Sequence, residues 1–266
     1  MVSIKVLETN EKTGEMSFLL SDASPALANA IRRIVLEEVP TLAIEKVEFS
    51  NNNSILYDEV IAHRLGLTPL SSDLETYVLP DQCSCEGEGC ARCMVELSLK
   101  EKGPGVVKAG SIKSKDPKVI PVHTEMPIVK LLKGQEIEFV ATAVLGTGKD
   151  HAKWVPGNIW YNYLPKVTIN QKSKKLDECR DQYPQEIFKP DGSIDTEALK
   201  KPDVDPKLID ACAGVCDDVI SVEYDENSFV FHVESWGQLN PVEIVSAALD
   251  KLDEKFGQFE ENLKAV

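Results

Sequence analysis

Four of the seven cysteines stand close enough in the sequence to bind one metal ion. These four are Cys83, Cys85, Cys90 and Cys93. Four thiolates can close a tetrahedron around Zn²⁺ and leave no open coordination position, so such a site is structural rather than catalytic. Between the two cysteine pairs, Gly87 and Gly89 allow the loop to fold back. The spacing predicts one structural zinc site, with four free thiols or a redox pair as the alternative.

The remaining cysteines lie far from this loop. They are Cys179, Cys212 and Cys216. Taken with the first group, they leave open a second interpretation of the chain, as a stand-alone metal-dependent or thiol redox protein. That interpretation requires at least one reactive, exposed thiol and an open metal position. The closed spacing of the first four cysteines argues against it.

Other catalytic patterns are incomplete. Glu59 and His63 stand four apart, but a zinc protease motif needs a second histidine on that helical face. The stretch from Gly146 to Lys149 is similar to the end of a phosphate-binding loop, yet Asp150 replaces the Ser or Thr that would bind Mg²⁺. Neither motif supports an enzymatic function.

Composition limits the partners and the location of the chain. Its 266 residues can bury a sizeable core, and its net charge is −15. Since phosphate neutralisation supplies most of the affinity for nucleic acid, an acidic chain is not expected to contact DNA or RNA directly in a sequence-specific way. No apolar run approaches the ~20 residues of a membrane span, and the N-terminus lacks the pattern of a signal peptide. We expect a cytoplasmic protein without membrane contact.

The first elements that the pattern predicts are a β-hairpin and a helix. Residues 4–8 and 15–20 read as two strands around a polar turn. Ser24 and Pro25 are typical of a helix start, and Pro40 marks its end. An apolar stripe runs along this helix and comprises Leu27, Ile31, Ile34 and Val35. Arg32 and Arg33 lie off the stripe, where a solvated face is the simplest explanation.

The middle of the chain reads as α+β with antiparallel strands. Alternating apolar residues predict strands over 41–52, 95–99 and 137–145, and a short helix is expected over 57–66. Residues 159–169 alternate again. Residues 170–217 lose the long apolar runs, which indicates a small, loosely cored insertion.

The end of the chain predicts a second hairpin and a long helix. Residues 220–224 and 229–234 read as two strands around Asp-Glu-Asn, so both ends of the chain would be a hairpin followed by a helix. Asn240, Pro241 and Glu243 form a capping-box pattern. A seven-residue apolar repeat then follows and comprises Val245, Leu249, Leu252, Phe256, Phe259, Leu263 and Val266. Such a repeat could pack on its own domain, but a repeat that reaches the last residue favours a seam with a helix of another chain.

Several stretches of the chain resemble one known family. The motifs are ANAIRRIVLEEVPTLAI (28–44), DEVIAHRLGLTPL (58–70), KDHAKWVPGNIWYNYLPKV (149–167) and VESWGQLNPVEIV (233–245). They resemble the assembly subunit of cellular RNA polymerases, in its archaeal form known as the D subunit. This is the counterpart of the third-largest subunit of eukaryotic RNA polymerase II and of the bacterial α subunit. The resemblance covers nearly the whole chain and weakens between about 170 and 217.

The resemblance implies an α+β fold in three parts. A discontinuous, α-subunit-like dimerisation domain would comprise residues 1–47, 159–169 and 218–266. An antiparallel β-rich insert domain with the zinc loop would comprise residues 48–158. Residues 170–217 would be a degenerate ferredoxin-like insertion, in which Cys179, Cys212 and Cys216 are remnants of a ligand set. Because Pro206, Ile209 and Tyr183 occupy cysteine positions of the family pattern, an iron–sulfur cluster is not expected.

The function that the resemblance implies is that of a non-catalytic scaffold subunit in transcription. It would form a heterodimer with the small subunit L, then dock the second-largest and largest polymerase subunits and meet other small subunits. We assign docking of the large subunits to Arg32, Arg33, His63 and Arg64, because interfaces favour bidentate arginine. The seam with the small subunit would use both apolar stripes, namely Leu27, Ile31, Ile34, Val245, Leu249, Leu252, Phe256, Phe259 and Leu263.

Overall fold

A computed structural model describes residues 1–202 and 204–264 of the chain. By their contacts, these residues group into two compact units. The first unit contains Met1–Arg32 and Ile159–Val233, and the second contains residues 33–158 and 234–264. Each unit therefore combines two segments that are distant in the sequence.

This division differs from the three parts that the resemblance implies. The insertion at 170–217 groups with the N-terminal hairpin, and the last helix groups with the β-rich middle of the chain. A grouping by contacts within one chain does not test how domains form in an assembly. The three-part organisation remains a prediction.

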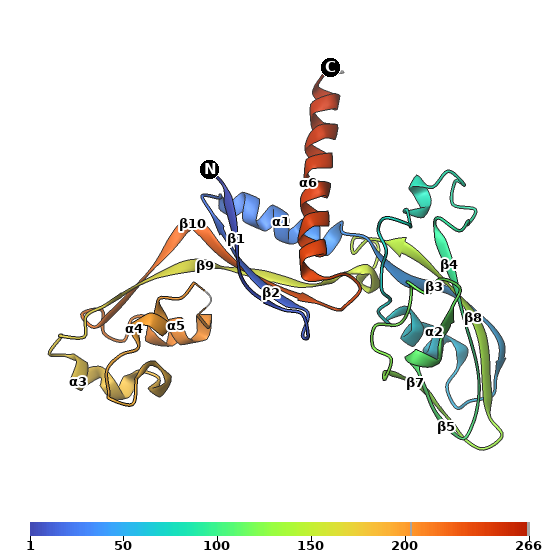
Figure 1. The fold of residues 1–266 in the computed structure, drawn as a ribbon, viewed down its shortest axis with the longest axis horizontal. Helices are drawn as coiled ribbons and strands as arrows, with labels where there is room; N and C mark the ends of the chain where they lie inside the picture. The colour runs from blue at the N-terminus through green and yellow to red at the C-terminus, as the bar shows by residue number, and fades with distance from the viewer. Residues whose placement is uncertain (203, 265–266) are drawn as a thin grey trace. The chain divides into compact units, whose positions relative to one another are not determined.

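The first unit is built on a four-stranded sheet with the order β1-β2-β10-β9. Its strands are β1 (Ser3–Asn10), β2 (Glu15–Ser21), β9 (Gly157–Ile169) and β10 (Ile220–Ser235). The two N-terminal strands, blue in Figure 1, thus share a sheet with the yellow and orange strands that follow the middle of the chain.

The N-terminal hairpin is confirmed. Strands β1 and β2 pair antiparallel, with Ile4 opposite Leu20. Met16, Phe18 and Leu20 alternate into the core and are all buried. Phe18 stacks on Phe231 of β10 with ring centroids 4.8 Å apart, so the sheet joins the two ends of the chain through its core as well as its hydrogen bonds.

The predicted second hairpin is wrong. Strand β10 continues unbroken through Asp225, Glu226 and Asn227. The Asp225 carboxylate accepts a 2.9 Å hydrogen bond from the backbone N–H of Asn227 and pairs with Lys166 of β9 at 2.9 Å. The carbonyl of Asn227 accepts a 3.0 Å bond from the N–H of Ala23. Because neighbouring segments satisfy these polar groups, the chain has no need to turn here.

Both helix starts are confirmed. Helix α1 comprises Pro25–Glu37, and the N–H of Leu27 donates a 3.2 Å hydrogen bond to Ser24 Oγ. Helix α6 comprises Pro241–Lys264. Its capping box is complete, because the N–H of Asn240 donates to Glu243 Oε2 and the N–H of Glu243 donates to Asn240 Oδ1, each at 2.9 Å.

The second unit is rich in antiparallel strands. Its larger sheet has the order β3-β8-β4-β6, and a smaller sheet pairs β5 with β7. The elements are β3 (Thr41–Asn52), α2 (Asp58–Gly66), β4 (Met94–Lys102), β5 (Gly105–Lys108), β6 (Lys113–Ser114), β7 (Pro127–Leu131) and β8 (Glu136–Gly146). The strands predicted over 41–52, 95–99 and 137–145 are confirmed, and the break in the alternation of β3 is a register shift between Ile44 and Lys46.

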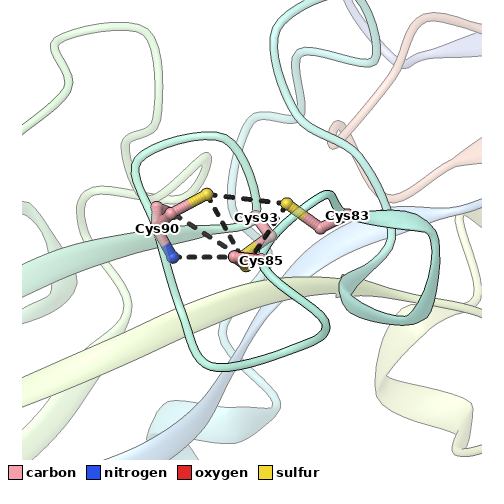
Figure 2. Close-up of side chains that lie close together, drawn as sticks. All are labelled: Cys83, Cys85, Cys90 and Cys93. Atoms are coloured by element: carbon pink, nitrogen blue, oxygen red, sulfur yellow. Dashed lines mark hydrogen bonds between the residues drawn. The ribbon is translucent and has the colours of Figure 1, made fainter.

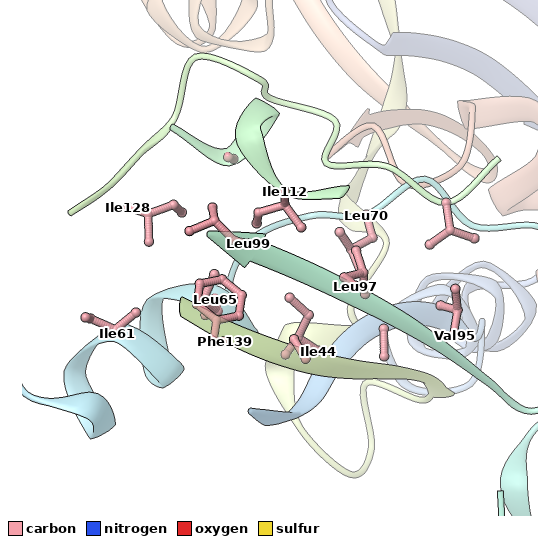
Figure 3. Packing of buried hydrophobic residues seen from close by; sticks show 14 of the residues in the cluster. Ile44, Ile61, Leu65, Leu70, Val95, Leu97, Leu99, Ile112, Ile128 and Phe139 are labelled. Carbon is pink, nitrogen blue, oxygen red and sulfur yellow. The ribbon is translucent and has the colours of Figure 1, made fainter. Parts of the chain in front are cut away.

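One face of the larger sheet forms the core of this unit. Val95, Leu97 and Leu99 of β4 are nearly fully buried, and Leu99 lies opposite Phe139 of β8 (Figure 3). Leu65 of α2 packs into the same cluster. This core supports β4, which follows directly after the cysteine loop.

The insertion in the first unit packs around a buried apolar cluster that it shares with the adjoining ends of β9 and β10, which corrects the expectation of a loosely cored segment. It contains α3 (Leu176–Cys179), α4 (Thr196–Leu199) and α5 (Pro206–Cys212). The buried residues of its cluster are Val167, Tyr183, Ile187, Ile194, Leu199, Ile209, Cys212, Val219 and Ile220. Most of these residues stand singly among polar ones in the sequence, so no apolar run indicated that they converge.

Candidate metal centre and interface surfaces

The four loop cysteines converge on one point. They lie between a short turn at Pro80–Gln82 and strand β4, and their sulfur atoms are all within 4.8 Å of one another (Figure 2). Among the residues that the structure describes, this is the only group of three or more His, Cys, Asp or Glu residues whose ligand atoms meet in this way. All four are free cysteines rather than disulfide partners.

The distances between the sulfurs fit tetrahedral coordination of one ion. Cys83 Sγ lies 3.5 Å from Cys90 Sγ and 3.4 Å from Cys85 Sγ. Cys93 Sγ lies 3.5 Å from Cys85 Sγ and 3.9 Å from Cys90 Sγ. A Zn–S bond of about 2.3 Å gives a tetrahedron with S···S edges of about 3.8 Å. The donor set and its spacing are therefore compatible with one Zn²⁺.

The backbone of the loop makes this convergence possible. Gly87 and Gly89 adopt φ values of 83° and 98°, which confirms that glycine is needed where the loop folds back. Glu86 also has a positive φ, 53°, and its N–H donates a 2.9 Å bond to the carbonyl of Cys83. No pattern in the sequence predicted the unusual conformation of Glu86, because glutamate seldom adopts it.

The cysteines differ in how readily they ionise. A hydrogen bond with the Cys83 thiol, aided by the backbone N–H of Gly89, lowers the pKa of Cys85 to about 6. Burial raises the pKa of Cys93 to about 12. A metal ion that takes all four as thiolates must therefore displace a firmly held proton from Cys93, which makes metal affinity depend on pH.

The other three cysteines do not form a group of metal-ligand spacing, although two of them are hydrogen-bonded to each other. Cys212 is fully buried in the core of the insertion, and Cys179 and Cys216 are half-buried beside it. A hydrogen bond between Cys179 and Cys216 raises the pKa of the Cys179 thiol. Ile209 and Tyr183, which stand where the family pattern has cysteine, are 1% and 3% exposed. The core of the insertion thus contains side chains at positions that would otherwise hold cluster ligands.

The two arginines of α1 make local contacts. Arg32 is half-buried and donates from Nε and Nη2 to Asn29 Oδ1 at 3.2 and 2.9 Å. Arg33 is exposed and forms a two-pronged pair with Glu37, with both N···O distances 3.1 Å. This pair raises the pKa of Arg33 and lowers that of Glu37. Being solvent-exposed, the pair contributes little to stability.

The two docking residues predicted on α2 are both exposed. Arg64 donates a 2.7 Å hydrogen bond to the carbonyl of Pro127, and His63 is its neighbour on the helix. Arg64 also lines a groove of 340 Å³ together with exposed Ile55 and Val106. The sequence did not predict that Ile55 and Val106 line a groove beside Arg64, since a single isoleucine or valine outside a regular pattern carries no signal.

The apolar stripes of α1 and α6 differ in exposure. Ile31 and Ile34 of α1 are buried within this chain, and Leu27 is half-buried. On α6, Val245 is buried and Leu249 and Leu252 are half-buried. The next three apolar residues are 61–62% exposed; these are Phe256, Phe259 and Leu263. The last residue of the predicted repeat, Val266, lies outside the described residues.

Among the described residues, no helix has the length and apolar character needed to cross a membrane.

Residues 47–158 match the RNA polymerase Rpb3/RpoA insert domain family. The chain is 40% identical over 269 residues to the DNA-directed RNA polymerase subunit Rpo3 of Pyrococcus horikoshii, covering 100% of this chain and 99% of that protein. It is 39% identical over 257 residues to subunit Rpo3 of Methanothermobacter thermautotrophicus, covering 93% and 95%. With Rpo3 of Archaeoglobus fulgidus it shares 36% identity over 256 residues, covering 96% and 95%.

The chain belongs to the Rpo3 family of DNA-directed RNA polymerase subunits. Rpo3 is the archaeal D subunit under another name and the counterpart of the third-largest eukaryotic subunit, so the resemblance drawn from the sequence motifs is confirmed. The mixed α/β fold with antiparallel sheets agrees with the insert domain family. Membership supports a non-catalytic subunit of a nucleotidyltransferase complex and disfavours a stand-alone metal or redox protein.

Proposed function

We propose that this chain is an assembly subunit of a cytoplasmic DNA-directed RNA polymerase and that it pairs with the small subunit L. The observation that carries the proposal is the exposed apolar face of α6. Phe256, Phe259 and Leu263 follow one side of a helix whose start is fixed by a complete capping box. Burial of such a side chain contributes roughly 1.5–3 kcal/mol, so a partner helix on this face would gain several such contributions.

The burial pattern narrows the seam that the sequence predicts. Ile31, Ile34 and Val245 are already buried within the chain, so they would not contact the partner directly. Direct contact falls to Leu27, Leu249 and Leu252, which are half-buried, and to the three exposed residues of α6. The partner would present a matching amphipathic helix.

Co-purification with subunit L tests the seam. Leu252→Asp combined with Phe256→Asp should abolish co-purification, because two charges would enter an apolar interface at a cost of several kcal/mol. Gln258→Asp combined with Asn262→Asp adds the same charge on exposed positions of the same helix and should leave pairing intact. Retention of subunit L by a folded first variant would show that the α6 seam is not the interface.

We also propose that Arg32, Arg33, His63 and Arg64 dock the second-largest and largest subunits. Exposed Arg33 and Arg64 each offer guanidinium donors beyond the hydrogen bonds they already make. Arg32→Glu should spare pairing with subunit L and weaken recovery of a large subunit in a reconstituted polymerase. Equal recovery of every subunit with this variant would remove Arg32 from the docking surface.

The cysteine loop is proposed to hold one structural Zn²⁺. The four sulfur positions support it, and the closed ligand set leaves no position for a substrate. The three remaining cysteines are proposed to bind no iron–sulfur cluster. Elemental analysis of anaerobically purified protein should give one zinc per chain and no stoichiometric iron. Absence of zinc would refute the zinc site, and stoichiometric iron would refute the absence of a cluster.

The three-part organisation is part of the same proposal. The family match over 47–158 supports the insert domain, and the sheet that joins β1 and β2 to β9 and β10 supports a discontinuous dimerisation domain of residues 1–47, 159–169 and 218–266. Hydrogen exchange in rising denaturant should protect these parts and the insertion at 170–217 to different extents. One common opening step for all of them would contradict it.

A further inference from the structure

A cavity in the first unit lies outside the proposed subunit interfaces. It has a volume of 260 Å³ and is lined by residues of β9, of β10, and of α5 with the segment before it. Tyr163 and Tyr224, from the two strands, are 40% and 47% exposed, so the cavity opens to solvent. Its volume is close to that of one long side chain, whereas drug-sized ligands occupy larger pockets.

The walls of the cavity are mostly apolar and aromatic, with Asn162 and His232 as polar lining residues besides Asp210. Pro202 and Pro206 form part of one wall, and the rings of Tyr163 and Tyr224 line the others. Proline side chains are rigid and tyrosine has two side-chain torsions, so a ligand that enters orders little of the wall. Such walls favour a flat group that can lie against a ring.

Among the described residues, the carboxylate that lines this cavity belongs to Asp210, which is exposed at its rim. Asp210 of α5 lines the cavity, and its Oδ1 accepts a 2.9 Å hydrogen bond from the hydroxyl of Tyr224. Within residues 1–202 and 204–264, Tyr224 is the one side chain found to donate to this carboxylate. A carboxylate offers about four lone-pair sites, so this bond leaves acceptor capacity for a ligand that donates hydrogen bonds and carries positive charge.

We propose that this cavity binds the guanidinium group of an arginine side chain presented by a protein partner. Guanidinium is planar, stacks on aromatic rings and donates in a fork that matches a carboxylate. A lysine ammonium is more strongly hydrated and lacks the flat face, and a phosphate would be repelled by Asp210 and by a chain of net charge −15. No residue of α6 lines the site, and the site does not depend on the assembly role proposed above.

The site also gives the insertion a function without a metal cluster. Pro202, Pro206 and Asp210 all belong to the insertion, and α5 is held in place by Ile209 and Cys212 in the insertion core. The packing that replaces cluster ligands thus positions the carboxylate.

Titration with short peptides tests the proposal by methyl NMR on the full chain. Val204, Ile209 and Val230 line the cavity and serve as reporters. The probe is the blocked tripeptide Gly-Arg-Gly, compared with Gly-citrulline-Gly, which has the same shape without the charge, and with Gly-Lys-Gly. We expect saturable shifts of the three reporters at millimolar arginine peptide, and at least fivefold weaker binding of the other two.

Two variants distinguish the specific effect of the Asp210 carboxylate from the effect of the net charge of the chain. Asp210→Asn should weaken arginine peptide binding by about tenfold, in keeping with the loss of a charged hydrogen bond. Asp217→Asn makes the same charge change at an exposed position of the insertion outside the cavity and should bind like the wild type. Absent saturation, equal binding of the citrulline peptide, or unchanged binding by a folded Asp210→Asn chain would each overturn the proposal.

Discussion

The two cysteine-bearing regions of this chain are ordered in different ways. Between Pro80 and Met94 the only buried residues are Cys83 and Cys93. This loop has no apolar core, yet its four sulfurs converge. The insertion at 170–217 has an apolar core, and its cysteines are packed into or beside it without all three meeting at one point. A short segment can be ordered by ligands around an ion or by buried apolar area. Cysteines are candidate ligands in the first case and packing residues in the second.

Metal removal should separate the two regions most strongly. Structural zinc in small sites supplies on the order of 10–16 kcal/mol of apparent binding free energy, so loss of the proposed ion should leave the loop with only its few exposed backbone hydrogen bonds. Treatment with a chelator, or Cys90→Ser, should abolish hydrogen-exchange protection over the loop residues 81–93, which precede β4. Protection over 170–217 should stay unchanged.

The matched control is Cys216→Ser in the insertion. Cys216 is half-buried and outside the converging group, so this variant should retain one zinc per chain. The comparison breaks down if Cys216→Ser loses zinc, or if chelation exposes both regions together.

A substitution that creates a cavity in the insertion core should destabilise the insertion and leave the cysteine loop unchanged. Ile187 is 1% exposed within that core, and Ile187→Ala should destabilise the insertion by roughly 2–5 kcal/mol. Zinc content and protection of the loop should not change, because the loop does not share this core. Urea titration followed by the methyl signals of Leu199 measures the first effect, and elemental analysis checks the second. Unaltered urea resistance would mean that the insertion does not depend on its apolar cluster.

Elements whose causes are local could be predicted from the sequence. The capping box at Asn240 and Glu243 depends on residues three apart, and the strand alternation of 137–145 depends on neighbours two apart. The cysteine spacing belongs to the same class, since its ligands lie within eleven residues. Local causes are visible in a short window of sequence. The capping box and the strand were confirmed, and the four sulfurs were found together, while the zinc ion itself stays a prediction.

Features set by distant partners could not be predicted in this way. The triplet at 225–227 reads as a turn, but it continues β10 because Lys166 and Ala23 satisfy its polar groups. The stripes of α1 and α6 are both apolar, yet Ile31 is buried and Phe259 is exposed. Periodicity indicates that a face must be covered and does not indicate which chain covers it. The insertion core was missed for a similar reason, as most of its members are isolated in sequence.

The smallest expected effect is a difference in the sign of pH dependence. In the loop, protons would compete with the proposed metal ion for thiolates, so the order of the loop should be lost as pH falls. In the insertion, burial raises the pKa of the Cys212 thiol, and a hydrogen bond with Cys216 raises that of Cys179. A raised pKa in the folded state gives a contribution that is complete below the unfolded thiol pKa of about 8.5 and lost as pH rises above it.

The insertion should therefore unfold at lower urea at pH 10 than at pH 8, as followed by the methyl signals of Ile187 and Leu199. Cys212→Ala should lower the midpoint at pH 8, because it opens a small cavity, but should reduce its fall between the two pH values. A residual fall is expected from Cys179, which keeps its raised pKa. If the variant and the wild type lose equal stability between pH 8 and pH 10, the neutral thiol of Cys212 is not part of what holds this core together, and the cysteine would be a passive filler of space.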